Sequence, residues 1–331
     1  MYYLGDDARY ESMHYNVCKK TGLKLPAVSL GMWQNFGGKD NYENARAILL
    51  RSFDLGITYF DISNNYGMPK GSAEETFGRV LKADFARYRD EMIITTKVGY
   101  DMWQGPYGAG GTRKHIIAST EQSLRRIGID YVDVLYSHRF DADTPLEETI
   151  AAFDLLIRQG KALYIGFSTG YSAKVMEQII EIASRLGTPC AFHMSRYSMF
   201  NREPEAELQT LLHGNGYGSI AFSPLAEGAL TDKYLNGIPA ESRASKNAGN
   251  TTKYISEQAK LEKVVQLNRI AKGRGQSLAQ LAIAWVLREG RSQSALVGAS
   301  RVSQIEDSVA ALNRLDFSSE ELEAIECILR D

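Results

Sequence analysis

Four polar residues stand at or just past the ends of short apolar runs: Asp61, Tyr66, Lys97 and His138. The runs have the length and composition of buried strands. In a parallel barrel the C-terminal ends of all strands meet at one face, and that face holds the active site. Side chains distant in sequence can therefore meet there. A tyrosine, a lysine, a carboxylate and a histidine together are suited to placing a proton on a carbonyl oxygen.

Each of the four residues can be given a role in such a transfer. Tyr66 is the candidate general acid, although a free phenol has a pKa of about 10. A nearby Lys97 ammonium is expected to lower that pKa, and Asp61 to keep the ammonium charged. His138 is the candidate second donor to the substrate oxygen. None of these groups is a hydride source, so the chemistry requires a cofactor, most simply a reduced nicotinamide.

Each residue also has an ordinary structural interpretation. Asp61 suits a helix cap, Tyr66 a packing position, Lys97 a rim charge, and His138 a buried polar group. Metal binding by Asp61 and His138 lacks a third ligand at a convincing spacing. A barrel hydrolase or lyase using the same two residues is a further alternative. The functional interpretation is favoured because all four residues fall at the same end of consecutive strands.

The rest of the chain alternates apolar runs with helix-spaced patterns. About eight strand–helix units without a break in composition predict an α/β fold, a single (β/α)8 barrel over residues 1–331. A β-hairpin is expected at 15–27, and extra helices and two long loops, 98–112 and 231–256, at the C-terminal face. The helix over 72–82 opens with Ser-Ala-Glu-Glu, a capping-box pattern. The rival doubly wound sheet would need Gly-x-Gly-x-x-Gly after its first strand, which 29–38 lacks.

Bulk composition excludes several classes of protein. The 331 residues are 44% apolar and 24% charged, with a net charge of −2. This balance gives no reason to expect nucleic acid or a membrane as partner. Three scattered cysteines and a start unlike a signal peptide predict a cytoplasmic protein with reduced thiols and no metal site.

These residues also carry a resemblance to a known family. The segment Gly-Ile-Thr-Tyr-Phe-Asp-Ile-Ser-Asn-Asn-Tyr-Gly (56–67) resembles the first signature of the aldo-keto reductases, which are NADPH-using barrels. Segments 71–78 and 297–301 are similar to two other motifs of that family. Segments 99–108 and 136–139 are most similar to its L-glyceraldehyde 3-phosphate reductase branch, which is related to potassium channel β subunits. The resemblance covers almost the whole chain.

The resemblance implies an NADPH site, the catalytic tetrad named above and a tendency to form homo-oligomers. The implied cofactor contacts are Trp33, Asp61, Ser168, Thr169, Met194, Phe222, Ser223, Pro224, Leu225, Ala226, Gly228, Lys233, Arg243, Gly298, Ser300, Gln304, Asp307 and Ser308. Three of them depart from the family pattern: Thr169 and Ser308 replace asparagines, and Met194 replaces a glutamine. Met194 matters most, because a thioether cannot replace both hydrogen bonds of an amide. His193 and Ser195 are candidates to compensate.

The predicted function is NADPH-dependent reduction of small aldehydes, phosphorylated or not, to alcohols. Arg113 and Arg139 are the candidate contacts for a substrate phosphate. The alternative is a nicotinamide-binding regulatory protein with slow or no turnover, resembling the channel β subunits.

Overall fold

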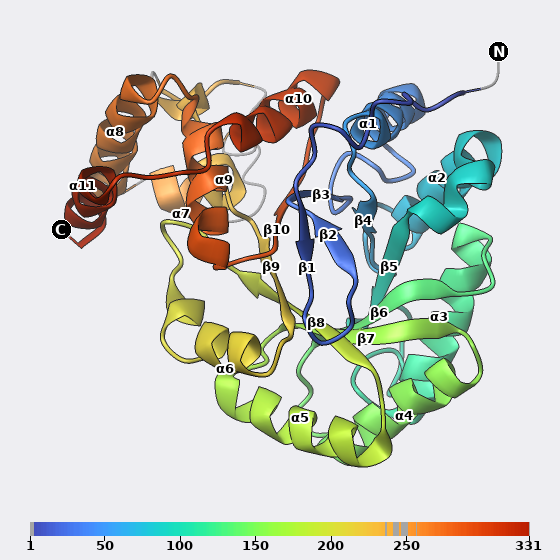
Figure 1. Cartoon of the computed structure of the whole chain (residues 1–331). Helices are drawn as coiled ribbons and strands as arrows, with labels where there is room; N and C mark the ends of the chain where they lie inside the picture. Colours follow the sequence, from blue (N-terminus) through green and yellow to red (C-terminus); the bar gives the residue numbers. More distant parts are fainter. Residues whose placement is uncertain (1–2, 236, 241–244, 246–250, 256, 331) are drawn as a thin grey trace.

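The computed structural model describes residues 3–235, 237–240, 245, 251–255 and 257–330. Parallel strands form a closed barrel in the order β10-β3-β4-β5-β6-β7-β8-β9, with helices around the outside (Figure 1). The strands are β3 (Val28–Gly31), β4 (Tyr59–Asp61), β5 (Ile93–Val98), β6 (Val132–Arg139), β7 (Ala162–Thr169), β8 (Cys190–Arg196), β9 (Gly218–Phe222) and β10 (Ser294–Val297). The predicted (β/α)8 barrel is confirmed.

Helices follow the strands around the outside of the barrel, and one of them, Thr251–Ile255, lies in the segment 231–256 that was predicted as a long loop. They are α1 (Tyr42–Asp54), α2 (Ser72–Val80), α3 (Arg113–Ile127), α4 (Leu146–Arg158), α5 (Ala173–Leu186), α6 (Leu208–Gly214), α7 (Thr251–Ile255), α8 (Gln258–Gly273), α9 (Leu278–Leu287), α10 (Val302–Ala310) and α11 (Ser319–Arg330). Helices α8 and α11 pack together at one side of the barrel (Figure 1). The sequence pattern predicts a single helix over 203–213, but the structure divides this segment into a 3-10 turn, Glu203–Glu205, and α6.

A hairpin of β1 (Tyr15–Val17) and β2 (Lys24–Pro26) confirms the prediction over 15–27. Its residues Cys18 and Leu25 are buried in the same apolar cluster as Tyr59, Val134 and Phe192 of the barrel interior. The Cys18 thiol lies 3.5 Å from the backbone oxygen of Ala191. The hairpin therefore covers the N-terminal end of the barrel, and the opposite end stays open for a site.

The capping box predicted at the start of α2 is wrong. The N-cap is Gly71, whose φ of 91° is left-handed, and no side chain caps the helix. Ser72 is already helical, and its hydroxyl is buried without a hydrogen-bond partner in the described part of the chain. Glu74 turns inward instead, where it accepts from Thr96 at 2.6 Å and from Arg126 at 2.6 Å.

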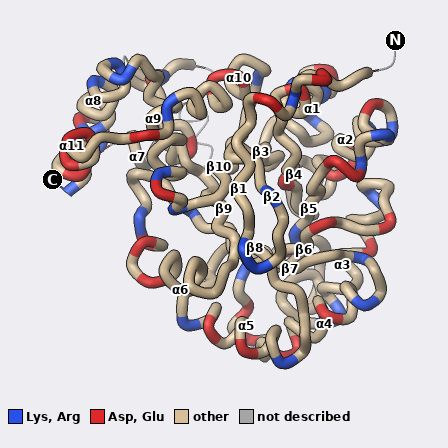
Figure 2. Tube along the Cα trace, in the orientation of Figure 1, with Lys and Arg blue, Asp and Glu red and all other residues tan. Residues whose placement is uncertain are grey.

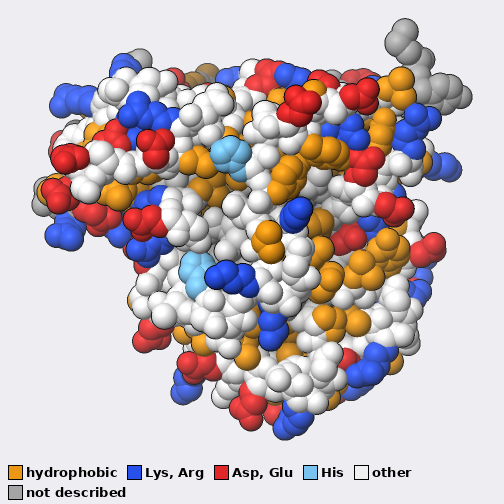
Figure 3. All heavy atoms as spheres, in the orientation of Figure 1, with side chains coloured by type: hydrophobic (Ala, Val, Ile, Leu, Met, Phe, Trp, Pro, Cys, Tyr) orange, Lys and Arg blue, Asp and Glu red, His pale blue; other side chains and the backbone are white. Residues whose placement is uncertain are grey.

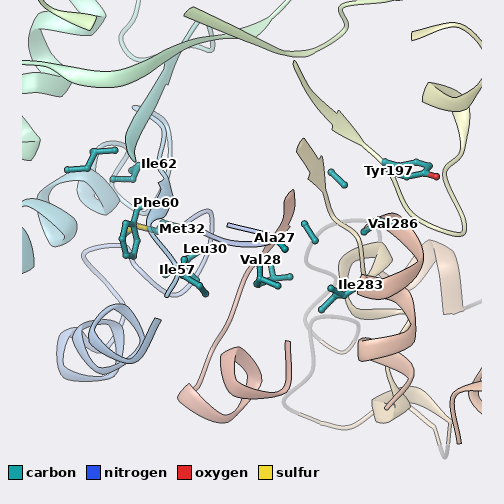
Figure 4. Close-up of a cluster of buried hydrophobic side chains, with 14 of the residues drawn as sticks. Ala27, Val28, Leu30, Met32, Ile57, Phe60, Ile62, Tyr197, Ile283 and Val286 are labelled. Carbon is teal, nitrogen blue, oxygen red and sulfur yellow. The ribbon is translucent and has the colours of Figure 1, made fainter. Parts of the chain in front are cut away.

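Alternation along the strands sorts side chains between two layers. In β4, Phe60 points outward, where it joins Ile62, Leu30 and other apolar side chains between strands and helices (Figure 4). Tyr59 belongs to the inner cluster, and Asp61, two residues on, shares its face. The same period puts Lys97 of β5 and His138 of β6 on the inner side of their strands.

Charged residues lie largely on the helices and loops outside the barrel (Figure 2). On the face shown in Figure 3, basic and acidic side chains are interspersed. This mixture agrees with a net charge of −2 for the whole chain.

Candidate active site

Lys97 is the centre of the polar cluster at the open end of the barrel. Its ammonium nitrogen, fully buried, donates to Asp61 Oδ2 at 2.5 Å, to the backbone oxygen of Ile62 at 2.9 Å and to the Tyr66 hydroxyl at 3.2 Å. An ammonium has three protons, so all of its donors are used. Because Lys97 donates into the phenol oxygen, the Tyr66 proton must point elsewhere. Tyr66 lines the cavity described below, so its proton is available there.

Asp61 and Lys97 form a buried ion pair of no net charge. Burial raises the pKa of Asp61, and the attraction of Lys97 opposes that change. Burial likewise lowers the pKa of Lys97, and Asp61 opposes it. Thr95 adds a further hydrogen bond to Asp61 Oδ1 at 3.1 Å. The close contact between Asp61 and Lys97 stabilises both charges at a buried position where either charge alone would carry a large desolvation penalty.

The expectation that the pKa of Tyr66 lies below the ordinary value of a phenol is wrong. Burial, followed by the negative charge of Asp61, raises the pKa of the Tyr66 phenol well above its usual range. Desolvation outweighs the nearby ammonium. Tyr66 therefore keeps its proton at neutral pH, which is the state that a proton donor requires.

His138 is held between two tyrosines. Its ring meets Tyr66 edge-on at a centroid distance of 5.7 Å and Tyr100 at 4.7 Å. Burial and the charge of Lys97 lower its pKa well below the usual range, so the imidazole is neutral. Its Nδ1 lies 2.9 Å from the Ser63 hydroxyl. Ser63 was not among the predicted site residues, although it lies in the 56–67 segment between Asp61 and Tyr66.

A cavity of about 1530 Å³ opens at this end of the barrel. It is larger than the range of roughly 300–1,000 Å³ typical of small-molecule sites, which leaves room for a dinucleotide together with a substrate. Of the predicted residues, the cavity lining includes Trp33, Asp61, Tyr66, His138, Ser168, Thr169, Met194, Phe222, Ser223, Pro224, Leu225, Gly228, Lys233, Gly298, Ser300, Gln304, Asp307 and Ser308. Lys97 and Ala226 lie behind this surface. Arg243 lies outside the described residues.

The segment after β9 has the backbone of a ligand clamp. Ser223, Ala226 and Glu227 have positive φ values of 54°, 47° and 57°, which residues with a Cβ rarely adopt. Such strained residues concentrate where a ligand is held. Ser223 and Glu227 line the cavity. Gly298 lines it too, and a Cβ added there would meet only the Gly31 oxygen within 4 Å among the described residues, so the space beside its backbone is open. These features fit a phosphate-bearing nucleotide.

At the start of α10 the predicted contacts are already bonded to one another. Gln304 Oε1 accepts from the Ser300 backbone N–H at 2.8 Å and from its hydroxyl at 3.1 Å. Ser308 donates to the Gln304 backbone oxygen at 2.7 Å. Asp307 accepts from Ser277 and from Gln280, the residues that cap α9. Asp307 and Ser308 thus hold α10 in place, while Ser300 and Gln304 are bonded to each other where the start of α10 lines the cavity.

The two predicted phosphate contacts do not line the cavity. Arg113 is paired with Glu148 at 3.0 Å. Arg139 is exposed and stacks on Tyr100, with 5.5 Å between its guanidinium and the ring centroid. Arg196 does line the cavity, 5.7 Å from the Phe222 ring centroid. The sequence contained the signal for Arg196, because it follows Met194 by two residues and therefore shares its side of β8.

Met194 is buried at the cavity wall, where the family pattern has a glutamine. The expected substitutes are already occupied. His193 uses Nδ1 for the Ser195 hydroxyl at 2.8 Å and Nε2 for the Tyr171 backbone oxygen at 3.2 Å. Neither His193 nor Ser195 is therefore free to replace both hydrogen bonds of a glutamine amide.

The described part of the chain contains no group of three or more His, Cys, Asp or Glu side chains placed to hold a metal ion. None of its helices combines the length and the apolar character needed to cross a membrane.

Comparison with known proteins agrees with this geometry. Residues 27–330 match the model of the Aldo/keto reductase family. Over its full length the chain is 51% identical to the L-glyceraldehyde 3-phosphate reductase of Escherichia coli O157:H7 and 50% identical to that of strain K12, covering 96% of each. It is 38% identical, over 91% of its length and 92% of the relative, to a probable voltage-gated potassium channel subunit beta of Arabidopsis thaliana. The chain is an oxidoreductase and belongs to the aldo/keto reductase family.

Proposed function

We propose that the protein reduces small aldehydes to alcohols with NADPH, using Tyr66 as the proton donor. The observation that carries this proposal is the set of three hydrogen bonds that the Lys97 ammonium donates. Its three protons go to Asp61, Ile62 and Tyr66, so the phenol can only donate toward the cavity. A carbonyl oxygen placed there accepts that proton.

Residues of the chain supply the proton and stabilise the negative charge that its transfer leaves behind. Bound NADPH would supply the hydride to the carbonyl carbon. Tyr66 gives its proton to the carbonyl oxygen as negative charge develops there, and the product is an alcohol. The phenolate left behind lies 3.2 Å from the Lys97 ammonium, which stabilises it until a proton returns through the cavity. Lys97 thus favours the phenolate, although burial keeps the pKa of the phenol raised overall.

The cofactor would lie along the cavity wall made by β9, the segment after it and the start of α10. Phe222 offers a flat apolar surface to the nicotinamide, and Lys233 lines the cavity as a cation for a phosphate. Arg243 is assigned the same role from the sequence resemblance. The start of α10, with Ser300 and Gln304, suits the remaining phosphate because helix N-termini favour anions.

The specific substrate that we propose is L-glyceraldehyde 3-phosphate, the compound in the names of the two Escherichia coli relatives. Arg196 is the cation that we assign to its phosphate. It lies on the cavity wall and is paired only loosely, at 3.7 Å, with Glu227. Replacement by methionine is expected to raise KM for the phosphorylated substrate and to leave KM for L-glyceraldehyde nearly unchanged. An equal effect on both substrates would remove Arg196 from this role.

The proposed function is tested by following NADPH absorbance with the purified protein. L-glyceraldehyde 3-phosphate, L-glyceraldehyde and methylglyoxal are offered in turn, with NADH in parallel. Turnover with NADPH on at least one of them is expected. Binding of NADPH without turnover of any of these aldehydes would instead support a regulatory role. The 38% identity to a probable potassium channel subunit beta is the reason to consider that alternative. Cytoplasmic residence and homo-oligomer formation stay predictions from the sequence.

A further inference from the structure

Lys97 and Tyr136 are direct neighbours on the inner wall of the barrel. They pair in register across β5 and β6, and Tyr136 pairs in turn with Gly166 of β7. The Tyr136 side chain is fully buried in the apolar cluster of the barrel interior, and its hydroxyl lies 2.6 Å from the hydroxyl of Tyr59 on β4. Strand β5 lies between β4 and β6. The two tyrosines therefore bridge the inner side of the strand that carries Lys97.

Gly166 leaves the space that the Tyr136 ring occupies. A Cβ at position 166 would lie 2.4 Å from the Cε1 atom of that ring, far closer than two non-bonded carbon atoms approach. The ring therefore packs directly on the backbone of β7, while the hydroxyl at its far end is held by Tyr59. Contacts on two sides fix the position of the ring inside the barrel.

The ammonium of Lys97 contacts two aromatic rings. Its nitrogen lies 4.7 Å from the ring centroid of Tyr66 and 6.0 Å from that of Tyr136. The face of an aromatic ring attracts a cation at such distances, and more strongly where water is excluded. Tyr66 lines the cavity, whereas Tyr136 is fully buried behind it. Tyr136 thus contacts the ammonium from the interior of the barrel, away from the place of the substrate.

We propose that Tyr136 is a positioning residue, whose ring holds the Lys97 ammonium beside the Tyr66 hydroxyl. The inference rests on the proposed aldehyde reduction, in which that ammonium stabilises the phenolate left by proton transfer. Without the ring, the ammonium loses one aromatic neighbour and gains space into which it can move away from the phenol oxygen. Proton transfer then slows, whereas the groups that line the cavity, and with them the binding of aldehyde and NADPH, are left in place.

Tyr136→Leu removes the ring and tests this role. With an aldehyde that the wild type reduces, kcat is expected to fall about tenfold, within the range of a desolvated cation–π contact. KM and the dissociation constant of NADPH should stay within about twofold, because the lost contact acts on the transfer step and not on binding. Tyr136→Phe keeps the ring and should restore kcat to within about threefold of the wild type, the remainder being the lost hydroxyl contact with Tyr59.

Phe192→Leu is the matched control. Phe192 is fully buried in the same apolar cluster and packs on Gly218, where an added Cβ would also lie 2.4 Å from a ring atom. It belongs to β8, three strands away from β5. Urea titration should show that both leucine variants lose stability, while Phe192→Leu keeps kcat within about twofold of the wild type.

Three results would overturn the proposal: a Tyr136→Leu enzyme with the kcat of the wild type, an equal fall of kcat in Phe192→Leu, or a Tyr136→Phe enzyme no faster than Tyr136→Leu.

Gly166→Ala tests the same contact with the ring retained. The backbone of Gly166 has a conformation that other residues adopt, so the added methyl group acts by displacing the Tyr136 ring. A fall in kcat is expected. In the double variant with Tyr136→Leu, the alanine should change kcat by less than about twofold further, because no ring is left to displace. Falls that multiply in the double variant would show that the two residues act separately, against the proposal.

Failure of this role is distinguishable from failure of the proposed function. If the wild type reduces no aldehyde with NADPH, both are wrong. If the wild type is active and Tyr136→Leu is equally active, aldehyde reduction stands and only the role of Tyr136 is wrong.

Discussion

At the scale of single residues, the site depends on buried polar groups that hold one another through hydrogen bonds. Lys97 uses all three of its protons and so dictates the direction in which Tyr66 donates. The Ser63 hydroxyl lies 2.9 Å from His138 Nδ1 and holds that ring from behind. Burial enforces these contacts, because an unsatisfied group in this place would cost about 1–3 kcal/mol.

Met194→Gln tests the departure from the family pattern in the cavity wall. An amide offers a donor and an acceptor where methionine has only a weak acceptor. NADPH is expected to bind about fivefold to tenfold more tightly, the effect of about one added hydrogen bond. The dissociation constant is measured by fluorescence titration. Met68→Gln makes the same change at a residue that is 60% exposed and should leave affinity unchanged. No gain for Met194→Gln would mean that the nicotinamide is held by other groups.

Asp61, Lys97 and His138 could be predicted from sequence because strand periodicity fixes which side chains face inward. Tyr66 lies in the loop after β4 and was predicted from its place just past the end of that strand. The direction of the Tyr66 pKa shift could not be predicted. It depends on whether burial outweighs the Lys97 ammonium, and neither the depth of burial nor the distance between the two groups can be known from sequence. Ser63 was missed for a similar reason. A serine has many ordinary uses, and only the contact with His138 distinguishes this one.

At the scale of elements, α2 is held to its neighbours by a buried carboxylate. Glu74 is fully buried and pairs with Arg126 of α3 while accepting from Thr96 of β5. The sequence pattern predicted the start of α2 at Ser72 correctly but misassigned its cap, because Ser72 and Glu75 have the spacing of a capping box whereas the N-cap is Gly71. Which glutamate turns inward depends on Arg126, 52 residues further along the chain.

Glu74→Gln is expected to destabilise the fold by about 3 kcal/mol or more, since it leaves a partly buried arginine without its counter-charge. The free energy of unfolding is measured by urea titration. Glu306→Gln is the matched control. Its pair with Arg51 is exposed on both sides, 40% and 44%, and such pairs contribute at most about 1 kcal/mol. Equal losses for the two variants would show that the buried pair does not hold α2.

At the scale of the whole molecule, the barrel has one closed and one open end. The hairpin of β1 and β2 fills the closed end, and the cavity occupies the other. Eight-fold alternation of strands and helices made this architecture predictable. The split before α6 was not predictable, because Glu205 is held in place by Arg288, 83 residues further along the chain, as well as by the nearby Tyr197 and Arg202.

Acid should weaken the folded barrel through His193. Burial lowers the pKa of His193 from 6.5 to about 4. Between these values the unfolded chain binds a proton that the folded chain does not, so the free energy of unfolding falls as pH falls. The contribution of this residue should fall by about 2 kcal/mol from pH 7 to pH 5. Urea titrations of wild type and His193→Gln at both pH values check this, since the variant should lose that part of the pH dependence. Parallel pH curves for the two proteins would contradict it.

Tyr66→Phe tests whether the Tyr66 hydroxyl gives the proton during reduction. NADPH oxidation is followed with an aldehyde that the wild type reduces, and NADPH binding is measured on the same samples. The account predicts a fall in kcat of at least about 100-fold with NADPH affinity nearly unchanged. Tyr164→Phe, which removes a hydroxyl from a partly buried tyrosine of β7 outside the cavity lining, should keep most of its activity. A Tyr66→Phe enzyme that still turns over within about threefold of the wild type would contradict the account, because general acid catalysis by a positioned side chain contributes far more than that.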